Sequence, residues 1–221
     1  MVEGQCGGLV KPIAQNSMRI QITFSKRGAL RYTGHLDLHK LWERAARRAE
    51  LPLAYSQGFH PQPKMNIAAA LPLGFSSTCE VLDMRLEQEI PLEGLQEKLQ
   101  ATLPPDIQVM NIEAVDERAP TLQTQVLSAE YEVRVIDSSF ASEVKRRIDS
   151  VMESDSIIRT RREKEYDLRP LIEGLKLMDD VIIMKLAARE GATGRPEEVL
   201  DVLGIAFDET RIERTRLIFK T

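Results

Sequence analysis

The chain has 221 residues, of which 43% are hydrophobic and 29% charged, an ordinary balance for a globular protein. Its net charge of −4 and isoelectric point of about 5.6 argue against a general polyanion-binding coat. No apolar run approaches the roughly 18 residues that a membrane helix needs, and two cysteines, Cys6 and Cys79, are too few for a disulfide framework. The composition predicts a soluble cytoplasmic protein of two modules, each of about 100 residues.

The first 17 residues predict a disordered tail. Gly4, Gly7 and Gly8 disfavour regular structure, and no basic start followed by an apolar stretch marks a secretory signal. Met18 stands directly before a strand-like run, so we expect the folded part to begin at this residue.

The next hundred residues predict the order strand, helix, strand, strand, helix, strand. Alternating polar and apolar residues indicate the strands, and apolar residues at three- and four-residue steps, such as Leu38, Trp42 and Ala45, indicate the helices. The expected elements are a strand at 19–24, a helix at 35–50, strands at 66–71 and 79–86, a helix opened by Pro91 and a strand at 107–115.

The second half predicts the same order. Between its two middle strands, residues 169–174 are expected to form a turn or a single helical turn. The expected elements are a strand at 131–135, a helix capped by Ser138 or Ser139 with Phe140, Val144, Ile148 and Val151 on its apolar face, strands at 157–167 and 178–188, a helix opened by Arg195-Pro196 and a strand at 212–219.

This doubled order predicts an α+β fold. Strand, helix, strand, strand, helix, strand is the ferredoxin-like, or split βαβ, arrangement. We therefore expect two tandem ferredoxin-like modules with antiparallel sheets. The first is expected at 18–118 and the second at 128–221, with a polar linker at 119–127.

Charge is spread unevenly along the chain. Residues 19–64 hold nine basic residues against three acids, and residues 65–130 reverse the balance. A locally basic face on an acidic protein suggests a focused anion site, whereas a solvated helix face would show the same pattern. The candidate residues therefore have to be judged by their local context.

The first cluster is Arg31-Tyr32-Thr33-Gly34-His35, where the first strand turns into the first helix. A helix N-terminus presents free N–H groups to an anion, and Arg31 could add a fork for a phosphate or carboxylate. His35 could titrate near neutral pH, or could instead cap the helix or pack beside the sheet.

The second cluster is the column Lys40, Arg44 and Arg48, one helical turn apart. Such a column could follow a phosphate backbone. A solvated face is an equally good interpretation, because Glu43 stands four residues before Arg47 and can pair with it.

The third cluster is the loop from Ser56 to Lys64. Two prolines stiffen it, and Phe59 stands beside His60 in a setting suited to stacking a base next to a phosphate contact. If Phe59 turns inward, the loop merely covers the core. Further along, Asp167 and Arg169 point to one side of an extended strand and could form a structural pair or line a cleft.

The sequence lacks the motifs of several kinds of catalytic and cofactor-binding site. The sequence has no GxxxxGK[ST] phosphate loop, no GxGxxG, no HExxH and no serine nucleophile elbow. Neither cysteine belongs to a CxxC or CxxxCxxC pattern, so we expect no metal and no cofactor in this chain.

These clusters resemble those of a known protein family, and the resemblance extends over nearly all of the chain from Met18 onward. The chain resembles the bacterial radical SAM-linked (radical SAM-associated) proteins, although His60 stands where that pattern more often has Asn. The matching runs are Phe24 to Asp37, Glu43 to Arg48, Leu51 to Lys64, Ala70 to Gly74, Asp167-Leu-Arg169-Pro170 and Arg195-Pro196.

The resemblance implies a partner role. Members of that family have no established biochemical function and are fused to, or encoded beside, radical SAM enzymes, often near ribonuclease E/G and ribosomal protein genes. This implies work with a radical SAM enzyme in RNA modification or ribosome-related processing. Tandem ferredoxin-like modules are also similar to RAMP proteins, which include endoribonucleases, but that is an analogy of fold alone.

Three functional hypotheses follow. The leading one is a non-catalytic module that binds RNA or a partner. The second is a metal-independent endoribonuclease in which Tyr32 and His35 are the acid and base and Arg31 or Lys64 stabilises the phosphorane. The third is a protein-only adaptor for a radical SAM enzyme. The residues expected to contact a ligand or RNA are Arg31, His35, Arg44, Arg48, Ser56, Phe59, His60, Lys64, Asp167 and Arg169.

Overall fold

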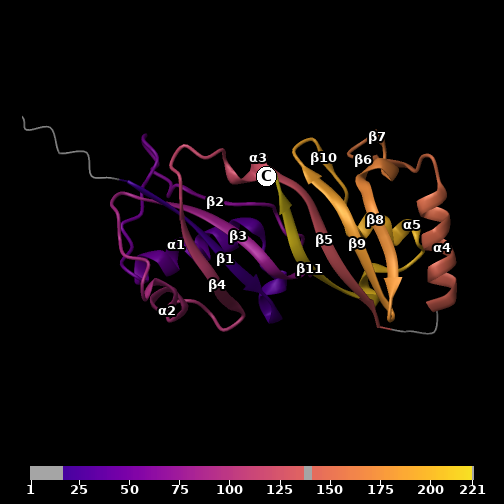
Figure 1. Cartoon of the computed structure of the whole chain (residues 1–221), viewed down its shortest axis with the longest axis horizontal. Helices are drawn as coiled ribbons and strands as arrows, with labels where there is room; N and C mark the ends of the chain where they lie inside the picture. The colour runs from indigo at the N-terminus through magenta and orange to yellow at the C-terminus, as the bar shows by residue number, and fades with distance from the viewer. Residues whose placement is uncertain (1–16, 137–140, 221) are drawn as a thin grey trace, which may run out of the picture.

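A computed structural model describes residues 17–136 and 141–220 (Figure 1). Residues 1–16 of the predicted tail, the predicted caps Ser138 and Ser139, and Phe140 lie outside the described residues. No helix among the described residues is long and apolar enough to cross a membrane.

The first half of the chain follows the predicted order. Strand β1 begins at Met18 and is followed by a short 3-10 helix before α1. The elements are β1 (Met18–Lys26), η1 (Gly28–Tyr32), α1 (His35–Arg48), β2 (Met65–Ile67), β3 (Ser76–Leu86), α2 (Leu95–Gln100) and β4 (Ile107–Val115).

The second half contains the same order with additional pieces. A small hairpin, β6–β7, separates its first helix from its second main strand. The elements are α3 (Leu122–Gln125), β5 (Val126–Val135), α4 (Ala141–Glu153), β6 (Ile158–Arg161), β7 (Lys164–Asp167), η3 (Arg169–Leu171), β8 (Ile172–Met178), β9 (Val181–Arg189), β10 (Ala192–Thr193), α5 (Pro196–Val202), η4 (Phe207–Glu209) and β11 (Thr210–Phe219).

The pairing of strands is ferredoxin-like in both halves, and the fold is α+β. The first half has the sheet order β4-β1-β3-β2, and the second has β11-β5-β9-β8, with every pair antiparallel. We call these two halves the first and second modules. Each order places the first and third strands in the centre, as the split βαβ arrangement requires.

The two modules share one sheet. β11, the fourth strand of the second module, pairs in parallel with β3 of the first at Glu213↔Ser76 and Arg214↔Ser77. The nine strands joined in this way, among the described residues, form the continuous band that runs through the centre of Figure 1. The segment predicted as a polar linker holds α3, with Leu122 buried, and the start of β5.

One strand prediction in the second module was wrong, and one strand, β8, was not predicted. Residues 157–167 form the β6–β7 hairpin rather than one strand, because Arg162 and Glu163 both adopt positive φ (50° and 64°) and reverse the chain. The strand predicted at 178–188 is the second arm of another hairpin, β8–β9, in which Asp179 and Asp180 (φ 45° and 65°) make the turn. Two-residue turns with positive φ at both positions match the twist of the flanking strands.

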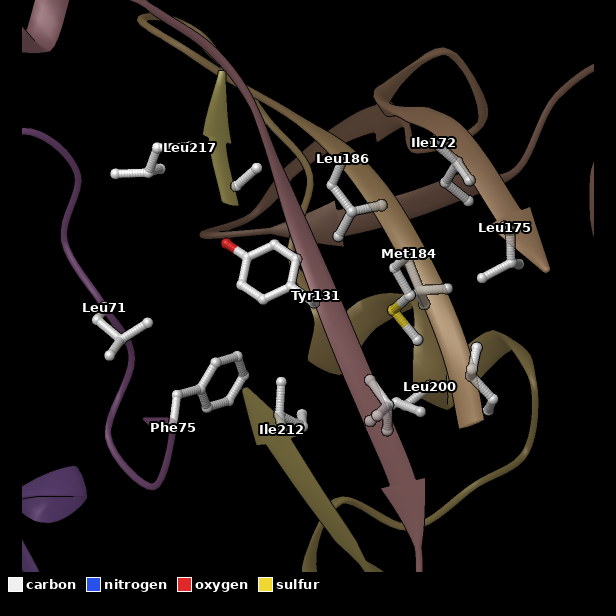
Figure 2. Close-up of a cluster of buried hydrophobic side chains, with 14 of the residues drawn as sticks. Leu71, Phe75, Tyr131, Ile172, Leu175, Met184, Leu186, Leu200, Ile212 and Leu217 are labelled. Carbon is white, nitrogen blue, oxygen red and sulfur yellow. The ribbon is translucent and has the colours of Figure 1, made fainter. Parts of the chain in front are cut away.

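Each module has its own hydrophobic core. In the first, Trp42 on α1 is fully buried and meets Phe24 of β1 edge-on, with ring centroids 4.8 Å apart. In the second, Tyr131, Met184 and Leu200 pack between the sheet and α5 (Figure 2). Leu71 and Phe75 come from the first module but belong to this second core, as Figure 2 shows, so the two cores are joined through the β2–β3 connection.

A buried ion pair lies where the modules meet. Arg214 of β11 and Glu80 of β3 are 1% and 0% exposed, and Nη2 of Arg214 lies 2.6 Å from Oε2 of Glu80. The guanidinium also donates to the carbonyl oxygens of Ala69 (2.9 Å) and Ala70 (3.3 Å). Burial lowers the pKa of Arg214, but the Glu80 carboxylate outweighs this and raises the pKa above its ordinary value. Both charges are therefore satisfied without water.

Candidate functional site

Helix α1 positions all three predicted clusters. Leu38, Trp42 and Ala46 anchor it on the sheet, and its outer face is exposed. The Arg31–His35 segment leads into its first turn. The Phe59 loop follows Tyr55, whose hydroxyl accepts a hydrogen bond from Arg47 in the last turn (3.2 Å). A helix of 14 residues is about 20 Å long, so the structure places the first and third clusters near opposite ends of α1.

The basic column lies along the outer face of α1. Lys40, Arg44 and Arg48 are exposed, and none of the three forms a salt bridge with a described residue. They line a groove of about 610 Å³ together with the Thr102–Pro104 turn, and Asp37 is the acidic residue in its wall. Arg47, in contrast, pairs with Glu43 at 2.9 Å, as the spacing predicted.

The Arg31–His35 segment begins with a stacked pair. The guanidinium of Arg31 lies 4.8 Å from the centroid of the Tyr32 ring, and its Nη2 donates to the Tyr32 hydroxyl at 2.9 Å. Tyr32 is 63% exposed. The backbone of Arg31 accepts a hydrogen bond from the N–H of Gly74 (2.8 Å), which ties the segment to the β2–β3 connection.

His35 is the first residue of α1, and Gly34 occupies the cap position before it without a side-chain cap. His35 does not cap the helix itself. Its partial burial lowers the pKa of its imidazole, the neighbouring His39 adds to this effect, and Glu80 opposes it. The ring is therefore neutral at pH 7, so it can accept a proton or a hydrogen bond but does not supply a positive charge to a phosphate.

Behind this segment lies a lysine that falls just beyond the strand predicted at 19–24. Lys26 is the last residue of β1, is 1% exposed and donates from Nζ to the carbonyl of Thr33 at 3.0 Å. Burial lowers the pKa of its ammonium group, Glu80 opposes this shift and Arg214 adds to it. Alternation along β1 could have revealed its inward side chain, because Ile22, Phe24 and Lys26 follow one another at two-residue steps.

The Phe59 loop is closed at its base and open at its tip. The Ser56 hydroxyl accepts a hydrogen bond from the N–H of Gln62 (3.0 Å), and the Ser56 N–H donates to the Gln62 carbonyl (2.8 Å). Phe59 is 102% exposed, so the alternative in which it covers the core is wrong. His60 and Lys64 are also exposed. Ser56 therefore shapes the loop, and Phe59 is the side chain that the loop presents.

Asp167 ties the two ends of the β6–β7 hairpin together, and Arg169 connects the segment after it to the end of α4. The Asp167 carboxylate accepts the N–H groups of Ile157 (2.8 Å) and Arg169 (3.0 Å), which lower its pKa. The Arg169 guanidinium donates to the carbonyls of Met152, Ser154 and Ile172 at 2.9–3.1 Å. These contacts give both side chains a place in the fold, and we do not include them in the candidate surface.

No group of three or more His, Cys, Asp and Glu side chains within 17–136 and 141–220 is placed to hold a metal ion. Cys79 is a free thiol, and burial raises its pKa to about 11, so it is not a reactive thiolate at neutral pH. The candidate surface thus consists of the outer face of α1, the Arg31–His35 segment and the Phe59 loop.

Comparison with known proteins places the chain in a family. Residues 19–196 match the model of a family described as "Uncharacterized protein conserved in bacteria (DUF2344)", and the chain belongs to that family. No curated protein matches the chain significantly.

Proposed function

We propose that this member of an uncharacterised bacterial family is a non-catalytic protein that binds single-stranded RNA along α1. The observation that carries the proposal is the row Lys40, Arg44 and Arg48, whose charges are exposed, unpaired among the described residues and gathered on one groove. Basic side chains spaced along a groove follow a phosphate backbone, and the ions that they displace from the RNA drive binding.

The Phe59 loop supports the same proposal. A fully exposed phenylalanine contributes nothing to the hydrophobic core, yet the Ser56–Gln62 hydrogen bonds hold its loop in one shape. Aromatic side chains presented in this way stack on unpaired bases. Arg47 contacts Tyr55 at the base of the loop, so the loop continues from the basic face of α1.

The second part of the proposal concerns the partner. We propose that the protein works with a radical SAM enzyme, in RNA modification or ribosome-related processing, and presents RNA to it. This part rests on the family resemblance of the sequence motifs.

Binding to RNA can be measured directly. Fluorescence anisotropy with a labelled single-stranded RNA should show saturable binding that weakens steeply between about 50 mM and about 200 mM salt. A duplex of the same sequence serves as the comparison and should bind less tightly, because its bases are not free to stack on Phe59. Undetectable binding at low salt would contradict the proposal.

A metal-independent endoribonuclease is the second candidate. The lowered pKa of His35 favours it, because a neutral imidazole beside the basic surface could act as a general base, with Tyr32 as the acid. Incubation of RNA with the protein in EDTA tests it. Cleavage that His35→Ala abolishes would replace the binding proposal, and intact RNA would remove the nuclease.

A protein-only adaptor is the remaining alternative. Capture of the radical SAM enzyme by the purified chain, with and without nuclease treatment, separates it from the RNA-binding proposal. Capture that survives nuclease treatment, together with no binding to RNA alone, would favour the adaptor.

A further inference from the structure

A glycine between two aromatic rings forms an unusual feature at the junction of the modules. Gly74 lies in the β2–β3 connection with φ +87°, a conformation that favours glycine. A Cβ on this residue would lie 3.4 Å from Cζ of Phe207 and 3.9 Å from Cε1 of Tyr32. The two rings therefore converge on the space that the missing side chain leaves open.

Each ring is supported by the protein and still accessible. Arg31 lies over the Tyr32 ring at 4.8 Å, and Phe207 stacks on the buried Phe75 with ring centroids 5.8 Å apart and an interplanar angle of 24°. Tyr32 remains 63% exposed and Phe207 42% exposed. Support on one side with exposure on the rest is how a protein fixes an aromatic ring for stacking without burying it.

The two rings come from different modules. Tyr32 belongs to η1 in the first, and Phe207 belongs to η4 directly before β11 in the second. The β11–β3 pairing and the buried Arg214–Glu80 pair fix the second relative to the first. The spacing of the rings is therefore set before any ligand arrives, which reduces the entropy lost on binding.

We propose that Tyr32, Gly74 and Phe207 form a slot that stacks one nucleobase of a single-stranded RNA. The proposal rests on the proposed function, because it assigns one end of the RNA-binding surface. A flat, polarisable ligand suits two aromatic rings that border a glycine. The first turn of α1 begins at His35, three residues after Tyr32, and its free N–H groups, together with Arg31 beside Tyr32, would receive the adjoining phosphate.

The position of the slot favours a base over a protein side chain. The slot lies at the start of α1 and the Phe59 loop lies near its end, about 20 Å away for a helix of 14 residues. Lys40, Arg44 and Arg48 occupy the outer face between them. An RNA strand laid along this face would thus have its phosphates on the basic row and one base stacked at each end.

An abasic scan tests the slot. RNAs that lack one base at successive positions are bound to the wild-type protein and to the variants Tyr32→Ala and Phe207→Leu, and affinities are compared. We expect two positions where loss of the base weakens wild-type binding about 5- to 150-fold, as loss of one stacked base does: one at the slot and one at Phe59. The penalty at the slot position should largely disappear in both variants, because the base no longer has its stacking partner.

Three comparisons show whether the effect on RNA affinity is specific to the rings of the slot. Phe207→Leu retains an apolar side chain on Phe75, so the fold is preserved while the ring face is lost. Met110→Ala removes another exposed apolar side chain, which is 52% exposed on β4, and should leave the whole scan unchanged. Phe59→Ala should remove the penalty at a different RNA position.

The outcomes separate the two proposals. One outcome is that RNA binds, but the loss of affinity at each abasic position is the same for wild type and for Phe207→Leu. The slot is then overturned and RNA binding along α1 stands. If the scan is unchanged but Phe207→Leu abolishes capture of the radical SAM enzyme, the slot belongs to a protein contact and the base assignment is overturned. If the wild-type protein binds no RNA, both proposals fall.

Discussion

The first helix of each module follows the first strand of its own module and packs on the shared sheet, yet the two helices use their basic residues differently. On α4, Arg146 and Arg147 both donate to the Glu143 carboxylate, and Arg147 also donates to the carbonyl of Leu203 (2.6 Å). On α1, Arg44 and Arg48 have no such partner among the described residues and face a groove.

The same contrast extends to the surroundings of each helix. In the second module, Arg159 pairs with Asp201, and Arg161 pairs with Glu198 at 2.9 Å, so that two arginines of the β6–β7 hairpin hold it to α5. Partly exposed pairs of this kind contribute on the order of 1 kcal/mol each, but together they occupy the arginines. The comparison teaches that equal topology does not mean equal surfaces: the arginines of α4 and of the β6–β7 hairpin pair within the fold, whereas Arg44 and Arg48 of α1 have no salt-bridge partner among the described residues.

The largest expected effect would break the junction that makes the two modules one unit. Arg214→Met leaves the Glu80 carboxylate buried without its partner, which typically costs about 3–5 kcal/mol of unfolding free energy. Urea denaturation measures the loss, and both cores should unfold in one transition because the sheet is shared. Arg134→Met, at a pair whose arginine is 69% exposed, is the control and should change stability by less than about 0.5 kcal/mol. Equal effects of the two variants would contradict the structural role of the pair.

The next largest effect is on RNA affinity, and it compares reversal of charge on α1 with reversal of charge in the second module. Arg44→Glu with Arg48→Glu should weaken RNA binding strongly and lower the slope of log affinity against log salt by about 1.4, since each phosphate contact on a single strand contributes about 0.7. The charge-matched control is Arg134→Glu with Arg146→Glu, two exposed arginines of the second module. Anisotropy titrations at several salt concentrations measure both. A similar loss in the control pair would show that only net charge matters.

A smaller effect isolates the loop. Phe59→Ala should cost about 1–3 kcal/mol of RNA-binding free energy through lost stacking, with an unchanged salt slope. Its unfolding free energy should remain within about 0.5 kcal/mol of wild type because the side chain is fully exposed. Binding that does not change would remove Phe59 from the surface.

The smallest effect concerns pH. The lowered pKa of His35 means that the unfolded chain binds a proton more readily than the folded one, so the His35 contribution to stability is complete above about pH 6.5 and declines as the pH falls. His35→Gln should make stability less sensitive to acid in this window. An NMR titration of the His35 ring measures the pKa itself, and a value above that of a free histidine would contradict the direction.

The sequence predicted more of the fold than of the site. Alternation and three- to four-residue periodicity found the strands and helices of the first module, because Ile20, Ile22 and Phe24 keep the period of a strand and Leu38, Trp42 and Ala45 keep that of a helix. The two missed hairpins turn at Arg162-Glu163 and Asp179-Asp180, which lack the glycine or asparagine that usually marks such turns.

The candidate site depends on side-chain exposure and on contacts between distant residues, which the sequence alone does not reveal. The sequence could propose that Phe59 is exposed and that Arg44 and Arg48 are unpaired, but it left a buried Phe59 and a solvated arginine face as alternatives. Phe207 had no local signal at all: its role depends on Gly74 and Tyr32, more than 130 residues earlier in the chain. The hydrogen bonds between Ser56 and Gln62, which close the base of the loop, likewise had no signal in the sequence.

The place of β11 has a consequence for how the chain is made. β2 and β11 share one edge of β3, and β11 also covers the edge of β5 along most of its length. β11 is synthesised after every other strand in the sequence, so until then the ten-residue β5 presents unpaired backbone groups beside alternating apolar side chains. Such an edge readily recruits other chains. A chain that stops before residue 210 should therefore self-associate during expression. Pairing of β11 with β5 prevents this, because it covers the edge of β5 that would otherwise pair with another chain.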